Sequence, residues 1–182
     1  MTVPVTSPAR SPVHPPELRT RWSSQAPHRP PMAKLIVTTL TSVAALACLV
    51  LLGKLSGHLL LIPPMAASMA LVAAAPHLPL SQPRSVIGGQ VVSAVLGVGT
   101  GLVSHSFWAA AVAGSLAIGA TLWLRMPHSP AAATAVIGTM ATTGQVSFVV
   151  CSGIAACILV GFGILGSRFR GASGASYPTY WI

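Results

Sequence analysis

The polar residues that could act on a solute lie in two stretches broken by proline. The first stretch, residues 75–90, carries Arg84 among three prolines and ends in a glycine pair and Gln90. The second stretch, residues 125–130, carries Arg125 and His128 and also precedes small residues. Proline fixes φ and lacks an N–H group, so neither stretch can be plain helix or the interior of a sheet. Broken polar segments within an apolar chain are typical of the binding sites of membrane transporters.

Prolines also mark the expected starts of two short helices, at Pro64 and Pro130. A helix that starts within a membrane leaves its first N–H groups unpaired and carries about half a positive charge at that end. Together with the nearby arginines, two such ends favour a small anion. We therefore predict a substrate site lined by eight residues: Pro64, Ser68, Arg84, Gln90, Arg125, His128, Pro130 and Thr134.

The charged candidates have an alternative role. An arginine at the end of a membrane span often extends to the lipid headgroups as an interfacial anchor, which applies to Arg84 and Arg125. His128 could donate to an anion or take up a proton near neutral pH, or it could be a loop histidine that faces water. His77 has the same two alternatives.

The uncharged polar candidates also have a structural alternative. Gln90 could point into the cavity, or it could form a hydrogen bond between helices. The hydroxyls of Ser68 and Thr134 could line the site or bond back to their own helix, which is the commoner arrangement.

The composition indicates an integral membrane protein. Of the 182 residues 53% are hydrophobic and only 6% are charged, with a mean hydropathy of +0.75. A soluble domain has roughly a quarter of its residues charged. The net charge of +9 does not indicate nucleic-acid binding, because the basic residues are not clustered among aromatics. We expect a bacterial inner or plasma membrane, with an organelle membrane as the alternative.

The scarcity of acidic residues excludes several kinds of chemistry. Glu17 is the only acidic residue, and it precedes the first apolar segment. Paired-carboxylate hydrolysis, a Ser-His-Asp arrangement and carboxylate proton relays are therefore excluded from the membrane part. No two histidines stand three or four residues apart, so we expect no metal site, no cofactor and no enzyme activity. The three cysteines lie in apolar segments and are interpreted as packing residues: Cys48, Cys151 and Cys157.

The apolar segments predict an all-α membrane protein with four full transmembrane helices and two short, proline-broken helices, re-entrant or half-crossing. Residues 1–34 are predicted to be a disordered basic Pro-rich tail, 35–168 the transmembrane domain, and 169–182 a short C-terminal tail. The full spans are expected at Leu35–Gly53, Val86–Val103, Phe107–Leu124 and Val146–Gly166. The short helices are expected to run from about Pro64 to Ala75 and from Pro130 to Ala141.

Each half of the chain repeats the order long span, broken joint, short helix, long span, which predicts a two-fold internal repeat. The number of crossings has two solutions. Length favours four spans plus two re-entrant helices, and we adopt it. With four spans and both termini in the cytoplasm, Lys54, Arg84 and Arg125 all lie on the outer side of the membrane. With six crossings only Lys54 does, which fits the positive-inside rule better.

Small residues at four-residue spacing predict close helix contacts. The stripe on 86–103 consists of Gly89, Ser93, Gly97 and Gly101, and the stripe on 146–166 consists of Gly153, Cys157 and Gly161.

At the two joints the sequence resembles the HPP family of small integral membrane proteins, over about residues 35–168. The first match is Ala75-Pro76, Pro79-Leu80, Gln82-Pro83-Arg84 and Val86-Ile87-Gly88-Gly89. The second is the name-giving His-Pro-Pro element, represented here by His128, Pro130, Ala131 and Thr134. The chain departs from the family at Ser129, where the first proline of that element is expected, and at Ser85 and Gln90, where Asn and His are expected.

The resemblance implies a four-helix membrane protein, with members linked to nitrite transport. We therefore expect a transporter or channel for a small inorganic anion, with nitrite as the leading candidate and the lipid bilayer as its surroundings. So few spans enclose a pathway poorly, and a homo-oligomer is expected. The alternative is a membrane subunit that transports nothing and packs with partner proteins.

Overall fold

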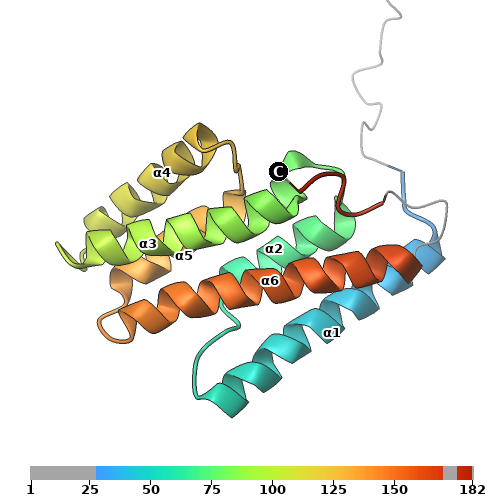
Figure 1. The fold of residues 1–182 in the computed structure, drawn as a ribbon, viewed down its shortest axis with the longest axis horizontal. Helices are drawn as coiled ribbons and strands as arrows, with labels where there is room; N and C mark the ends of the chain where they lie inside the picture. Colours follow the sequence, from blue (N-terminus) through green and yellow to red (C-terminus); the bar gives the residue numbers. More distant parts are fainter. Residues whose placement is uncertain (1–27, 170–175, 182) are drawn as a thin grey trace, which may run out of the picture. The chain divides into compact units, whose positions relative to one another are not determined.

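The computed structural model describes residues 28–169 and 176–181, so most of the predicted leading tail lies outside the described residues. The chain divides into a leading unit, Met1–Pro30, and a second unit, Pro31–Ile182. All helices of the described residues belong to the second unit, and these residues contain no strand (Figure 1). The expected all-α class is confirmed.

The helices begin and end within a few residues of the predicted bounds. In residues 28–169 there are six α-helices: α1 (Met32–Ser56), α2 (Pro63–Ala74), α3 (Gly89–Gly101), α4 (Phe107–Trp123), α5 (Ser129–Met140) and α6 (Gln145–Phe169). A 3₁₀ turn, η1 (Pro79–Ser81), and a π-helical segment, η2 (Arg84–Gly88), form the joint between α2 and α3. The prolines act as expected, because α2 begins with Pro63 and Pro64 and α5 carries Pro130 in its second position.

Two of the described helices are long and apolar enough to cross a membrane, α1 and α6, each of 25 residues. α4 and α2 are apolar but shorter. The lengths of α2 and α5 are equal, at 12 residues. Four full spans and the two-fold repeat stay predictions.

α1, α2 and α6 share one apolar core. Leu49 of α1, Met65 and Met69 of α2 and Leu159 of α6 are fully buried in a common cluster. α1 and α6 run antiparallel (Figure 1), and a Cβ on Gly166 would lie 2.8 Å from Thr41, so the last turn of α6 touches α1 closely in the first half of α1. This core supports one side of α2, and α2 also contacts α5.

α3 packs against α5 through the predicted stripe of small residues. A Cβ on Gly97 would overlap the carbonyl oxygen of Ala135, and one on Gly101 would lie 2.8 Å from that of Thr139. Glycine is required at both positions, because any side chain would push the two backbones apart. The close approach brings the polar residues of α3 and α5 within hydrogen-bonding distance.

The second stripe of small residues does not pack as expected along its whole length. Gly153 contacts Val91 of α3, but Cys157 and Gly161 are exposed, and a Cβ on Gly161 would meet nothing within 4 Å. The interpretation of Cys157 as a packing residue is therefore wrong within this chain. The reason is the orientation of α6, which turns Ala155, Ala156 and Leu159 toward the core instead.

Residues 176–181 return to the joint between α2 and α3. The Tyr177 ring is buried against Val72 and Val86, and the backbone N–H of Thr179 donates to Oε1 of Gln82 at 2.9 Å. Burial raises the pKa of the Tyr177 hydroxyl. The chain's last described residues thus belong to the structure that holds the joint in place.

Candidate functional site

Four of the eight predicted site residues meet in one buried polar cluster, which we call the His128 network: Ser68, Gln90, His128 and Thr134. They come from α2, α3, the residue before α5, and α5. Ser68, Gln90 and Thr134 are completely buried, and His128 is 3% exposed. The segments that contribute them are far apart in the sequence, so the network exists only when both halves of the chain are packed together.

The network forms a continuous chain of hydrogen bonds. The Thr134 hydroxyl donates a short bond to Oε1 of Gln90. The Gln90 amide nitrogen donates to Oγ of Ser68 at 2.9 Å, and Ser68 Oγ lies 2.8 Å from Nε2 of His128. Gln90 thus forms hydrogen bonds between helices, which was one of the two roles that the sequence allowed. Thr134 bonds across to α3 and not back to its own helix.

The backbone fixes the orientation of the His128 ring. Nδ1 lies 2.7 Å from the carbonyl oxygen of Leu80 in η1. A carbonyl oxygen can only accept, so Nδ1 carries a hydrogen and donates it. In the neutral ring Nε2 is then an acceptor, and the Ser68 hydroxyl donates to it. Gly89 makes room for this arrangement, because a Cβ there would lie 2.7 Å from Cβ of His128.

The two predicted arginines differ in their surroundings. Arg84 is half-buried, and its Nη2 donates to the carbonyl oxygen of Leu124 at 3.2 Å, which ties η2 to the end of α4. Its Nε is buried and finds no partner among the described residues. Arg125 is exposed and has a φ of 59°, in the left-handed region. The structure therefore brings Arg84, but not Arg125, into the packed joint.

The two predicted prolines lie next to the network. Pro64 is buried, and its carbonyl oxygen lies 2.8 Å from Ser68 Oγ, so this hydroxyl can also bond back to its own helix. Pro130 is buried at the start of α5, directly after His128 and Ser129. Both short helices thus begin close to the polar cluster, as the sequence predicts.

A cavity of about 190 Å³ adjoins His128 on the side of α4. Its walls are mostly apolar, and its polar wall is made by His128, Ser129 and Thr121. The Thr121 hydroxyl donates to Ala117 O at 2.8 Å and is committed to its own helix. Space for a small solute therefore lies beside the histidine and the first turn of α5, outside the closed hydrogen-bond chain.

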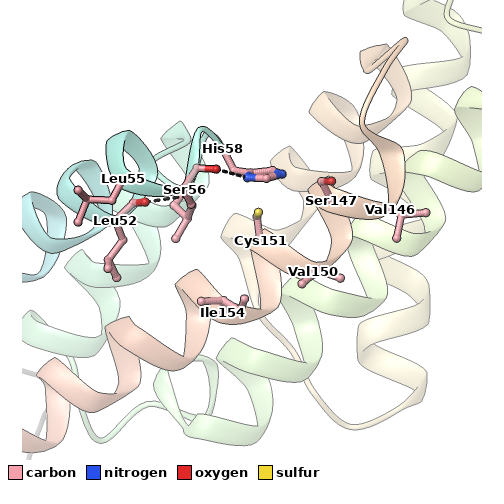
Figure 2. A pocket seen from close by; sticks show the side chains of 10 residues that line it. Leu52, Leu55, Ser56, His58, Val146, Ser147, Val150, Cys151 and Ile154 are labelled. Carbon is pink, nitrogen blue, oxygen red and sulfur yellow. Dashed lines mark hydrogen bonds between the residues drawn. The ribbon is translucent and has the colours of Figure 1, made fainter.

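A larger cavity, of about 550 Å³, is lined by none of the eight predicted residues and lies between the end of α1 and the start of α6. Figure 2 shows the His58 ring reaching across it toward Ser147, with the sulfur of Cys151 below. His58 is exposed, and its Nδ1 lies 2.8 Å from the carbonyl oxygen of Ser56. Most of the remaining wall is leucine, valine and isoleucine, so this cavity offers few groups that could bind an ion.

Sequence reasoning did not identify the groups that hold the joint. Gln82 is completely buried, and its amide nitrogen donates to the carbonyl oxygens of Pro76 at 2.8 Å and Leu78 at 3.0 Å. The carbonyl of Leu80 orients His128. An amide side chain between prolines could have indicated Gln82, but no sequence signal points to a backbone carbonyl.

Comparison with known families gives a match over most of the chain. The family model described as "HPP, transmembrane region" covers residues 27–178. No curated protein and no solved structure matches the chain. The family match extends over both proline-broken joints and all six described helices, and it agrees with the two long apolar helices in indicating an integral membrane protein. The chain belongs to the HPP family of membrane proteins.

Proposed function

We propose that this protein transports a small anion across a membrane and that the anion binds beside His128, between the starts of α2 and α5. Nitrite is the leading candidate, and a bacterial plasma membrane is the proposed location. The proposal includes four full spans with α2 and α5 as the two short helices of a two-fold repeat.

The observation that carries the proposal is the convergence of four polar side chains, Ser68, Gln90, His128 and Thr134, deep between apolar helices. Polar and ionisable groups inside membrane proteins are costly and commonly mark the path of a solute or ion. A packing role alone would not need a histidine, whose ring is held here by two hydrogen bonds.

The electrostatics of the joint favour an anion over a cation. Arg84 reaches the carbonyl of Leu124 at one side of the joint, and the first turn of α5 begins at the other. The chain has no Asp or Glu after Glu17 to neutralise Arg84 or to coordinate a cation. The cavity beside His128 has room for a three-atom anion with a few waters.

The test is nitrite uptake into proteoliposomes, compared with protein-free liposomes. Arg84→Ala should lower uptake about tenfold, which is the effect expected from losing one charge-assisted interaction. Lys54→Ala is the matched control, since Lys54 is an exposed cation in the last turn of α1, away from the joint. Uptake equal to that of empty liposomes, or equal losses in the two variants, would reject the assignment.

A second candidate function is that of a membrane subunit that transports nothing. The exposed Cys157 and Gly161 on α6 favour it, since small residues on an outer face permit close contact with another helix. The proposed homo-oligomer packs through the same face. Purification in a stable complex with another protein, with no nitrite uptake, would select this function.

A further inference from the structure

The His128 network has a property that depends on the position of one oxygen atom. Ser68 Oγ lies 2.8 Å from His128 Nε2 and also 2.8 Å from the carbonyl oxygen of Pro64. The hydroxyl has a single hydrogen, so it can donate to only one of these two acceptors at a time. Which acceptor it uses depends on whether Nε2 carries a proton.

Both protonation states of His128 are fully hydrogen-bonded without any movement of heavy atoms. In the neutral ring, the Ser68 hydroxyl donates to Nε2. In the charged ring, Nε2–H donates to Ser68 Oγ, and the hydroxyl hydrogen turns to the Pro64 carbonyl oxygen. Gln90 donates to the same oxygen in both states, and Nδ1–H donates to Leu80 throughout. A buried histidine can therefore gain and lose a proton here without leaving a polar group unpaired.

Among residues 28–169 and 176–181, the charged state nevertheless finds no counter-ion. The charged or titratable groups on the segments packed around His128 are His77, Arg84, Arg125 and Tyr177, none of which is a carboxylate. The only acidic residue of the chain, Glu17, precedes the helices. A positive charge buried without a partner is strongly unfavourable, and no described residue supplies a negative charge, so a proton on His128 calls for an anion from solution.

We propose that one proton and one anion bind together at His128, with the proton on Nε2 and the anion in the adjoining cavity of about 190 Å³. The two ions cross as a neutral pair, and both leave on the other side. Ser68 is a positioning residue, since its hydroxyl accepts from Nε2–H in the loaded state. This inference rests on the proposed anion transport and specifies its energy source.

The first experiment separates a proton gradient from a membrane potential. At pH 7–8, proteoliposomes that are one pH unit more acidic outside should accumulate nitrite to about tenfold the external concentration, and faster than protein-free liposomes do, because one pH unit is equivalent to a tenfold concentration ratio. An imposed membrane potential should leave the accumulation unchanged. Accumulation that follows an inside-positive potential and ignores the pH gradient would overturn the proton coupling while leaving anion transport intact.

Variants test whether the proton binds at His128. His128→Asn keeps an N–H donor but cannot be protonated, so it should lose the tenfold accumulation; retention of that accumulation would overturn the proposal. Ser68→Ala removes the acceptor of Nε2–H and should move the pH profile of uptake to lower pH. Ser93→Ala is its matched control, since Ser93 is also fully buried and its hydroxyl has no partner among the described residues. Equal pH profiles for the two serine variants would also contradict the role of Ser68.

A binding measurement distinguishes the failure of the coupling from the failure of the function. In weakly buffered detergent solution with a pH indicator, nitrite binding should be accompanied by the uptake of about one proton per anion. Nitrite binding without proton uptake would overturn the coupling alone. Absence of nitrite binding would overturn the proposed function together with the coupling. The variants are compared only after thermal unfolding has shown that each of them is folded.

Discussion

His128 and His58 both point Nδ1 at a backbone carbonyl oxygen, of Leu80 at 2.7 Å and of Ser56 at 2.8 Å. Beyond that bond their surroundings differ. His128 is buried, and its second nitrogen continues into a chain of side-chain hydrogen bonds. His58 is exposed at the edge of the largest of the cavities described above, where its neighbours are mostly apolar (Figure 2). A histidine therefore becomes part of a candidate site here through its long-range partners, and a nearby cavity alone is not enough.

The His128 network depends on the contact between α3 and α5. Breaking that contact should have the largest effect on the free energy of unfolding. Gly97→Val places side-chain atoms on the carbonyl of Ala135 and should lower the free energy of unfolding by about 3 kcal/mol. Gly99→Val is the control, since a Cβ at Gly99 meets nothing within 4 Å. Denaturant titration in mixed micelles measures both variants, and similar losses in the two would contradict the close packing.

The next test compares the two histidines directly. His128→Ala leaves the Leu80 carbonyl and the Ser68 hydroxyl without their partner in a buried place and should cost about 2 kcal/mol. His58→Ala removes an exposed side chain and should change stability by less than about 0.5 kcal/mol. The same titration measures both. A larger loss for His58→Ala would mean that the contacts around His58, and not the His128 network, stabilise the fold.

A smaller effect is expected at the far end of the network. Thr134→Val keeps the shape of the side chain and removes the donor to Oε1 of Gln90, which should cost about 1.5 kcal/mol. Thr142→Val, at an exposed position after α5, is the control and should be nearly neutral. If Thr134→Val proved neutral as well, the Gln90 amide would have to be satisfied in another way.

The smallest effect separates the two arginines. Arg84→Gln weakens the bond between η2 and Leu124 and should lower stability by about 1 kcal/mol. Arg125→Gln changes an exposed side chain and should have no measurable effect. Thermal unfolding of the two variants side by side gives the comparison. An equal loss would place Arg125 in the joint as well.

Local sequence patterns were sufficient to predict where the helices lie. The prolines at 64 and 130 set the starts of α2 and α5, because proline suits the first turn of a helix, and uncharged apolar runs gave α1, α4 and α6. The π-helical segment at Arg84–Gly88 was not predicted, since its effect on apolar spacing is too slight to detect.

Composition and motifs predicted the residue types of the candidate site but not their contacts. Ser68, Gln90 and Thr134 each had a local alternative, and only the packing of α2, α3 and α5 decides between them. The same limit explains α6, where the spacing of Cys157 and Gly161 gives a small-residue face but does not say whether it turns inward. Long-range packing is not encoded in the spacing of a single segment.

The contact between Thr179 and Gln82 has a consequence for biosynthesis. A ribosome makes the chain from its N-terminus, so Gln82 is synthesised and inserted well before the residues that complete its hydrogen bonds. Tyr177, which covers Val72 and Val86, arrives equally late. The joint between α2 and α3 can therefore form all its contacts only after translation has passed residue 179. A nascent chain stalled earlier lacks the hydrogen bond from Thr179 and the packing of Tyr177.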